Sequence, residues 1–522
     1  MCRIIFVSIV MLLCFALACS KGTADKNGTS LTYSVRITQP AAGDTVRGTL
    51  TVRATVFPLP DFVEFQFDTF PTVVDSTLPY NHSYNICEYP SGALSIRVSV
   101  YHDENEFAAE RSFYFEHIDC DTITSVILNG HIYVPESRLS RNETGCIVKM
   151  DLSEMGLNEE NCLGGIGYFC AALETLDISY NSLLNLDLSP LSVCSNLEYL
   201  DIRNNDIASI ELSPLVSCAG LAYLDLSNNE LNNIDLSSLA SNTNLEILNL
   251  SRNSISGISL SPLGSCPNLL YIYLYDNSLA EIDLTPLTSC DYLQSLTLSN
   301  NELTEIDLTP LADCEFIEFL SLGGNSLSTI ILSPIENWNE LSTILLAGNR
   351  ITSIDLSPVS GCSNLEFINI ASNLLSTIDL SPLGECGKLE YISIANNQVD
   401  DIDFGDFSGC SELVTINLET NLLTELDFAF LSGCPHIETI KASNNRLTNV
   451  NLSPLSSAAS LKYLDFGYNE LTGIDLNPLW DISSLETIKI WYNSLDAAAC
   501  AHVCDFIEAH PSCAVYTDCD CW

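Results

Sequence analysis

Basic residues are scarce in this sequence. Its 522 residues include 19 lysines and arginines against 67 aspartates and glutamates, giving a formal net charge of −48. Such a polyanion repels nucleic acids and anionic membrane surfaces, which excludes both as direct partners. The charge favours a basic protein partner or divalent cations, although a solvated acidic surface would explain it without any partner.

Catalytic signatures are missing as well. No HExxH, GxSxG, phosphate-binding loop or glycine-rich dinucleotide motif occurs at a strand–helix junction of the sequence. The seven histidines are scattered, and His436 alone falls inside the regular repeats described below. We therefore predict that the chain is not an enzyme and needs no cofactor.

Long apolar runs are lacking too. Residues 4–18 are apolar and follow Arg3, but they are too short to span a bilayer and have the pattern of an export signal. They end in Ala16-Leu17-Ala18-Cys19, which resembles the lipobox of bacterial lipoproteins and implies lipidation of Cys19; cleavage after Ala-x-Ala fits the same residues. We predict a signal peptide at 1–19, a tether at 20–30 and contact with a membrane only through a lipid anchor. The protein would be a cell-surface or outer-membrane lipoprotein, or otherwise secreted.

One pattern fills most of the chain and returns every 24 residues, in fourteen copies. An asparagine marks each copy: Asn181, Asn205, Asn229, Asn253, Asn277, Asn301, Asn325, Asn349, Asn373, Asn397, Asn421, Asn445, Asn469 and Asn493. Before it, spacing such as Leu197, Leu200 and Ile202 is that of a short strand entering a core. A fixed period of this length indicates stacked coils, with the strands forming a parallel sheet. A buried asparagine amide would bond backbone groups of its own and adjacent coils.

The second half of each copy, IDLSPLxxC, is expected to form a short helical turn on the back. In Ser189-Pro190 the serine suits an N-cap and the proline the first helical position. An aspartate precedes many of these turns, at 187, 235, 283, 307, 355, 379, 403, 427 and 475. A row of calcium ligands is one interpretation; we favour backbone hydrogen bonds to each carboxylate.

A column of cysteines follows each turn: Cys170, Cys194, Cys218, Cys266, Cys290, Cys314, Cys362, Cys386, Cys410 and Cys434. Asn242, Trp338, Ala458 and Ile482 take the same place in other copies. Neighbouring cysteines would lie within disulfide range. Because the position accepts Ala, Ile and Trp, we predict a buried core column instead.

The consensus LxxLxLxxNxLxxIDLSPLxxC resembles the leucine-rich repeat family, and its DLSPLxxCxxL half is similar to the backs of bacterial internalin repeats. The resemblance implies an α/β solenoid over residues 171–495, a horseshoe with the parallel sheet on the concave face and helical turns on the back. It also implies protein binding through the concave face. Internalins carry an immunoglobulin-like domain after the repeats, whereas here such a domain would come before them.

Residues 31–117 have a different pattern. Five segments alternate at period two, at 34–38, 49–56, 63–67, 94–100 and 111–115, and Pro, Gly and Asp clusters separate them. Residues 37–56 and 92–98 resemble bacterial immunoglobulin-like domains, which implies an N-terminal all-β sandwich.

Cysteine-rich segments bound the repeats, at 118–170 and 496–522. Cys120, Cys146 and Cys162 predict a disulfide-closed N-terminal cap and an oxidising compartment. Residues 496–510 predict a helix over the last coil. Five cysteines surround that helix, so one is free or pairs elsewhere. A zinc site is the alternative that we disfavour, with the candidate ligands Cys500, His502, Cys504, His510 and Cys513.

A partner would contact the outward strand positions, the third, fifth and seventh of each copy. These carry aromatic and apolar side chains that protein interfaces use as anchors. The predicted ligand-binding residues are Tyr199, Arg203, Tyr223, Tyr271, Tyr273, Tyr275, Phe319, Leu345, Phe367, Tyr391, Tyr463 and Trp491. We predict recognition or adhesion through a protein ligand. The alternatives are a self-associating envelope or matrix component and carbohydrate binding.

Overall fold

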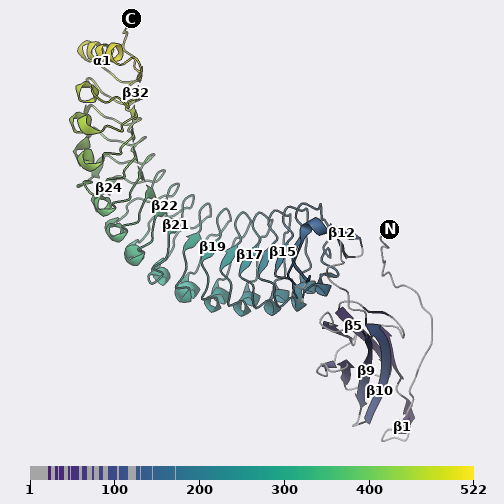
Figure 1. The fold of residues 1–522 in the computed structure, drawn as a ribbon. Helices are drawn as coiled ribbons and strands as arrows, with labels where there is room; N and C mark the ends of the chain where they lie inside the picture. The colour runs from purple at the N-terminus through teal and green to yellow at the C-terminus, as the bar shows by residue number, and fades with distance from the viewer. Residues whose placement is uncertain are drawn as a thin grey trace. The chain divides into compact units, whose positions relative to one another are not determined.

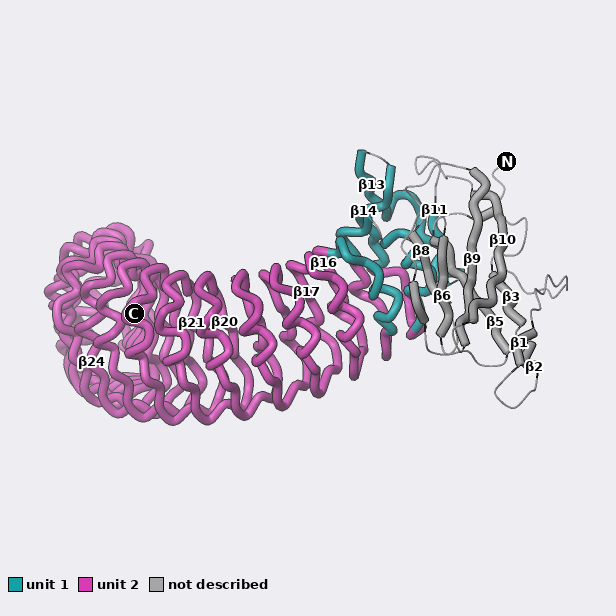
Figure 2. The backbone as a smooth tube through the Cα atoms, turned by 90° about the horizontal axis from the view of Figure 1, so that it is seen from below, with its two compact units in different colours: residues 1–152, 161–176, 187–197 teal, residues 153–160, 177–186, 198–522 magenta. Residues whose placement is uncertain are grey.

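The computed structural model describes the strands between residues 22 and 115, and residues 125–521 except 130, 144 and 171. The chain divides into two compact units, coloured separately in Figure 2. Unit 1 comprises residues 1–152, 161–176 and 187–197, and unit 2 comprises residues 153–160, 177–186 and 198–522. The predicted export signal and Cys19 lie outside the described residues.

The N-terminal part of unit 1 is built from strands alone among its described residues. They are β1 (Gly22–Ala24), β2 (Ser30–Thr32), β3 (Ser34–Gln39), β4 (Thr45–Val46), β5 (Thr49–Phe57), β6 (Phe62–Phe67), β7 (Val73–Asp75), β8 (Asn81–Asn85), β9 (Gly92–His102) and β10 (Asn105–Phe115). One sheet has the order β4-β10-β9-β6-β7 and another the order β3-β5-β8. All five strands predicted from alternation are present. The immunoglobulin-like assignment stays a prediction.

Two hairpins follow before the regular coils begin. β11 (Ser125–Leu128) pairs antiparallel with β12 (Ile132–Pro135), and β13 (Leu139–Arg141) with β14 (Ile147–Asp151). The short turns η2 (Glu136–Arg138) and η3 (Ile166–Tyr168) and the strand β15 (Thr175–Asp177) complete this region. Cys120 lies outside the described residues, so the disulfide closure of this cap stays a prediction.

Unit 2 is a curved row of coils whose strands pair in parallel, with short helical turns on the outside of the curve (Figure 1). The main sheet runs in the order β16 (Tyr199–Asp201), β17 (Tyr223–Asp225), β18 (Ile247–Asn249), β19 (Tyr271–Tyr273), β20 (Ser295–Thr297), β21 (Phe319–Ser321), β22 (Thr343–Leu345), β23 (Phe367–Asn369), β25 (Tyr391–Ser393), β27 (Thr415–Asn417), β29 (Thr439–Lys441), β31 (Tyr463–Asp465), β32 (Thr487–Lys489) and β33 (Ala514–Tyr516). From β16 to β32, each strand pairs with the strand 24 residues later, as Tyr199 does with Tyr223, and β32 pairs with β33 of the cap, 27 residues later. Two smaller parallel pairs are β24 (Thr377–Asp379) with β26 (Asp401–Asp403), and β28 (Glu425–Asp427) with β30 (Asn449–Asn451).

The asparagine column joins each coil to the one before it, as predicted. Asn205 Nδ2 donates to the carbonyl of Ile178 in the preceding coil at 3.1 Å and to that of Ile202 in its own coil at 3.0 Å. Its Oδ1 accepts from the backbone N–H of Leu183 at 3.2 Å. These contacts satisfy backbone groups that would otherwise be buried without partners.

The back of the coils consists of 3₁₀ turns, which confirms the predicted short helices. They are η4 (Ser189–Val193), η5 (Ser213–Ser217), η6 (Ser237–Ser241), η7 (Ser261–Ser265), η8 (Thr285–Ser289), η9 (Thr309–Leu311), η10 (Ser333–Asn337), η11 (Ser357–Gly361), η12 (Ser381–Glu385), η13 (Phe428–Gly433), η14 (Ser453–Ser457) and η15 (Asn477–Leu479).

The predicted serine N-cap is wrong. Ser189 is the first residue of its turn, and its backbone N–H donates to Asp187 Oδ1 at 2.8 Å. The aspartate thus does the capping from outside the turn. Every aspartate of the column makes this bond to the residue two positions later, which confirms the structural interpretation of that column.

The cysteine column is buried, as predicted, and several of its side chains share a second property. They donate to the carbonyl 27 residues earlier: Trp338 Nε1 to Leu311 at 2.9 Å and Asn242 Nδ2 to Leu215 at 3.1 Å. The thiols of Cys266, Cys290, Cys362, Cys386, Cys410 and Cys434 do the same at 3.1–4.0 Å. A donor at this position explains why asparagine and tryptophan can replace cysteine. Burial raises the pKa of Cys386 and of Cys410 to about 12, so both thiols remain protonated donors.

One pair departs from the predicted core role, because Cys170 and Cys194 are joined by a disulfide in unit 1. Cys266, Cys290, Cys314, Cys362, Cys386, Cys410 and Cys434 form none.

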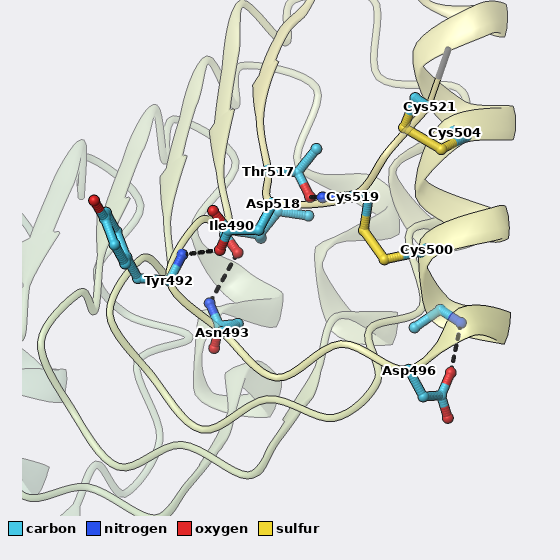
Figure 3. Close-up of a disulfide and its surroundings, with 11 residues drawn as sticks. Ile490, Tyr492, Asn493, Asp496, Cys500, Cys504, Thr517, Asp518, Cys519 and Cys521 are labelled. Atoms are coloured by element: carbon cyan, nitrogen blue, oxygen red, sulfur yellow. Dashed lines mark hydrogen bonds between the residues drawn. A yellow bond between two sulfur atoms is a disulfide. The ribbon is translucent and has the colours of Figure 1, made fainter.

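The C-terminal cap confirms the predicted helix. α1 (Ala497–Ala509) begins after Asp496, whose Oδ1 accepts from the Ala499 backbone N–H at 2.8 Å. Figure 3 shows the disulfides Cys500–Cys519 and Cys504–Cys521, which tie α1 to the C-terminal tail. Cys513 is the unpaired cysteine of the five and is buried. With both helix cysteines in disulfides, the zinc alternative has lost two of its ligands.

Candidate functional site

The candidate site is the solvent-facing side of the main sheet in unit 2, which we call the concave face. It comprises the third, fifth and seventh positions of each copy, such as Tyr199, Asp201 and Arg203, while Leu200 and Ile202 between them are buried. Of the predicted ligand-binding residues, Phe319 is 41% exposed and Trp491 37% exposed. The other ten are half-buried. All twelve therefore reach the surface.

At the N-terminal end of the concave face, two tyrosines cover two aspartates. The rings of Tyr199 and Tyr223 stack with centroids 4.1 Å apart. The Tyr223 hydroxyl donates to Asp225 Oδ2 at 3.0 Å, and the Tyr199 hydroxyl to Asp201 Oδ2 at 3.4 Å. Asp201 and Asp225 hold the fifth position of their copies, which was predicted to face outward; they are nevertheless 0% and 2% exposed, because the rings lie over them. We call these four residues the tyrosine–aspartate cluster.

The tyrosine–aspartate cluster has an unusual electrostatic environment. Burial raises the pKa of Asp201 to about 6, since the ionised carboxylate loses its hydration, and a hydrogen bond from the Arg203 backbone partly opposes this. Arg203 Nε lies 3.3 Å from Asp201 Oδ2, and its guanidinium lies 5.6 Å from the Tyr180 ring centroid. Burial also raises the pKa of Tyr223. The cluster is therefore polar but poorly hydrated.

Three tyrosines of one copy form the next part of the concave face. The Tyr271 and Tyr273 rings are 6.0 Å apart and nearly parallel, and the Tyr271 hydroxyl donates to Gln294 Oε1. The guanidinium of Arg252 lies 5.7 Å from the Tyr275 ring centroid. These contacts hold the rings in fixed orientations, which lowers the entropy cost of using them in binding.

The middle of the concave face is apolar. Phe319 is exposed, Leu345 is half-buried, and the rings of Phe367 and Tyr391 stack with centroids 4.2 Å apart. Gly323, at the seventh position of the same copy as Phe319, has no side chain to project from the concave face. Contiguous apolar surface of this kind usually marks a contact site.

The C-terminal end carries a second aromatic group around Trp491. Its indole lies 6.1 Å from the Tyr468 ring, 5.8 Å from Tyr492 and 6.0 Å from Tyr516. All four side chains are exposed. The indole packs where a Cβ at Gly467 would collide with it, so that glycine is required. Sequence reasoning missed Tyr516, because it comes from β33 in the cap and not from a repeat.

No metal centre is found among the described residues, which contain no group of three or more His, Cys, Asp or Glu side chains arranged to hold an ion. Each aspartate of the column accepts a backbone hydrogen bond through Oδ1, for example from Ser189, Ser237 and Thr285. In the same part of the chain, no helix is both long and apolar enough to cross a bilayer.

Two family models match the chain. The model described as "Leucine rich repeat" matches residues 171–231, 219–279 and 339–399. The model described as "BspA type Leucine rich repeat region (6 copies)" matches residues 376–497. No curated protein matches the sequence.

Solved structures with similar folds come from bacteria and animals. A leucine-rich repeat protein of Leptospira interrogans is 22% identical with a TM-score of 0.57, over 70% of this chain and 95% of that one. The structure of the Drosophila Toll–Spätzle complex is 19% identical with a TM-score of 0.55, over 65% of this chain and 46% of that one. An internalin of Listeria monocytogenes is 24% identical with a TM-score of 0.48, over 66% of this chain and 89% of that one. At these identities the first two likenesses concern the fold alone.

The fixed 24-residue period, the parallel sheet with its 3₁₀ backs and the two family models agree. The chain belongs to the leucine-rich repeat family.

Proposed function

We propose that this chain is an exported, surface-anchored recognition protein that binds a protein partner through its concave face. The observation that carries the proposal is the series of ordered aromatic rings left accessible along one sheet face, from Tyr199 to Trp491. Ordered tyrosine and tryptophan side chains are the anchors that protein interfaces use most. Leucine-rich repeat proteins are commonly used for protein recognition and are typically not enzymes.

The disulfides of the C-terminal cap support export, because such bonds persist in oxidising compartments. Attachment through a lipid on Cys19 follows from the lipobox resemblance. The net charge of −48 supports a partner with a basic surface.

The test captures surface proteins with the full chain and identifies them by mass spectrometry. The captured protein is then purified, and its dissociation constant is measured for three chains: the parent, a variant with Tyr271, Tyr273 and Tyr275 changed to serine, and a control. The control changes the exposed apolar residues Val216, Ile331 and Leu374, which lie off the concave face, to serine. Circular dichroism checks that all three chains are folded.

We expect the tyrosine variant to bind at least tenfold more weakly and the control to bind like the parent. Equal affinity of all three chains would refute the assignment to the concave face. A chain that captures nothing and sediments as oligomers would support the self-associating envelope component instead.

A further inference from the structure

A lysine of this chain sits on a tyrosine–aspartate pair near the C-terminal end of the concave face. Lys489 Nζ lies 5.0 Å from the Tyr463 ring centroid and 3.6 Å from Asp465 Oδ2. The Tyr463 hydroxyl donates to the same Asp465 oxygen at 3.0 Å. The ring face and the carboxylate thus attract one cation together.

The same combination recurs wherever a cation of the described chain lies over a ring. Each such cation also pairs with an aspartate. The sets are Arg203 with Tyr180 and Asp201, and Arg252 with Tyr275 and Asp276. A tyrosine ring together with an aspartate is therefore a recurrent way in which this scaffold holds a positive charge, beside ion pairs such as Lys462 with Glu438.

The tyrosine–aspartate cluster repeats the geometry of the Lys489 site without its lysine. The Tyr223 hydroxyl donates to Asp225 Oδ2 at 3.0 Å, the same distance as for Tyr463 and Asp465. The fifth position of the following copy, which holds Lys489 at the C-terminal end, holds Asn249 here. Asn249 Nδ2 donates to Asp225 Oδ2 at 3.0 Å, so a neutral amide occupies the place of the ammonium group.

The charges of the cluster do not balance. Asp201 and Asp225 are paired residues of neighbouring strands, and both are buried. Among the described residues, Arg203 is the one cation in an ion pair with this cluster, and it pairs with Asp201. Buried carboxylates are normally matched by cations, because removing an ion from water is costly. The cluster is one positive charge short.

We propose that the tyrosine–aspartate cluster binds a lysine or arginine side chain of the protein partner, beside Tyr223 and Asp225. This inference rests on the proposed function and adds a chemical requirement to it: the partner presents a basic side chain at its contact with the N-terminal end of the concave face. The general acidity of the chain brings such a partner close, and the cluster gives one basic side chain a fixed place.

The first test fills the site with a lysine of the chain itself. Asn249→Lys places a lysine where Lys489 stands in the other site. Asn369→Lys is the matched control, because it adds the same charge at the fifth position of another copy, preceded by Thr343 and Leu345 instead of a tyrosine and an aspartate. Both substitutions remove an amide oxygen that accepts from the backbone N–H two residues later, at Ser251 and at Ala371. The two variants therefore share the loss of this backbone hydrogen bond, and Asn249→Lys also loses the bond from the Ser251 hydroxyl.

The probe is acetyl-pentalysine-amide, compared with acetyl-pentaglutamine-amide, titrated calorimetrically into the full chain at 150 mM salt. The salt suppresses diffuse attraction to the acidic surface. We expect Asn249→Lys to weaken pentalysine binding at least tenfold relative to Asn369→Lys. Equal affinity of the two variants, or equal binding of pentalysine and pentaglutamine to the parent, would overturn the proposal.

The second test opens the occupied site. Lys489→Asn gives the Tyr463–Asp465 pair the same neighbour that Asn249 provides for Tyr223 and Asp225, and should therefore add one pentalysine per chain. Lys441→Asn is its control, because the preceding copy has Thr415 and Asn417 at the corresponding positions. An unchanged stoichiometry in Lys489→Asn would count against the assigned geometry.

The outcome also separates this inference from the proposed function. If the purified partner loses affinity in the Tyr271, Tyr273 and Tyr275 variant but binds Asn249→Lys as well as Asn369→Lys, the cation site is refuted and the proposed function stands. If the partner binds all of these variants like the parent, both are refuted.

Discussion

The inside of each coil and the concave face differ in how closely neighbouring copies repeat the same residues and contacts. Inside, the asparagine column makes the same three backbone contacts in coil after coil, for example at Asn325 and Asn373. On the concave face, the corresponding positions of neighbouring copies differ, from Tyr223 to Ile247 and from Ser295 to Phe319. The comparison teaches that repetition supplies stability, and that departures from repetition are free to supply specificity.

Tryptophan offers the largest expected contrast between the two regions. Trp338 is 1% exposed and bonds the Leu311 carbonyl, so Trp338→Ala should lower the free energy of unfolding by about 4 kcal/mol. Trp491 is 37% exposed, so Trp491→Ala should cost about 1 kcal/mol. Urea unfolding followed by circular dichroism measures both. Similar losses would show that the concave face also carries stability.

Asparagine gives the next contrast. Asn325→Ala leaves the buried Leu303 N–H without its acceptor and removes one of the two amide donors to the Leu298 carbonyl, the other being Asn301, so it should cost about 3 kcal/mol. Asn268 is exposed and donates to the Thr243 carbonyl at 3.2 Å; Asn268→Ala should change stability by no more than about 0.5 kcal/mol. The same unfolding assay applies, and a small effect at Asn325 would contradict the role assigned to the column.

The smallest effect concerns pH on the concave face. Burial raises the pKa of Asp201 from 3.8 to about 6, so the folded chain holds this proton at higher pH than the unfolded chain does. Lowering the pH from 7 to 5 should therefore stabilise the parent relative to Asp201→Asn by about 1 kcal/mol. The measurement is the free energy of unfolding of both chains at each pH.

The control for this pH effect is Asp283→Asn. Hydrogen bonds from Thr285 lower the pKa of Asp283, which is the opposite shift, so its contribution is lost only as the pH falls further towards that lowered value. Between pH 7 and 5 the difference between parent and Asp283→Asn should stay constant. A parallel trend in both variants would mean that the effect does not come from the tyrosine–aspartate cluster.

The spacing of residues along the sequence was sufficient to predict the local structure within a single coil. The strand at Leu200, the buried role of Asn205, the turn at Asp187 and the helix after Asp496 all follow from residues close together in the chain. Each depends on periodicity or on hydrogen bonds within a few residues, and such patterns are visible in one copy.

Contacts between coils could not be predicted in the same way. The donor role of the cysteine column appears only when Trp338 is seen against a carbonyl in the preceding coil. The burial of Asp201 depends on the stacking of tyrosines from two coils, and Tyr516 joins Trp491 through strand pairing of the cap. The serine N-cap was wrong because Asp187, two residues earlier, offers the better acceptor.

The bonds of the asparagine column run in one direction, from each coil to the one before it. Asn469 bonds the Leu447 N–H and Asn493 bonds the Leu471 N–H, with identical geometry. If one 24-residue copy were inserted or deleted inside the array, the asparagines on either side of the change would still find equivalent backbone partners in the preceding coil. Each such step moves the tyrosine–aspartate cluster and the Trp491 aromatic group about 4.8 Å further apart or closer along the sheet. The length of the array can therefore change in steps of one coil, while the residues of the tyrosine–aspartate cluster and of the Trp491 aromatic group stay the same.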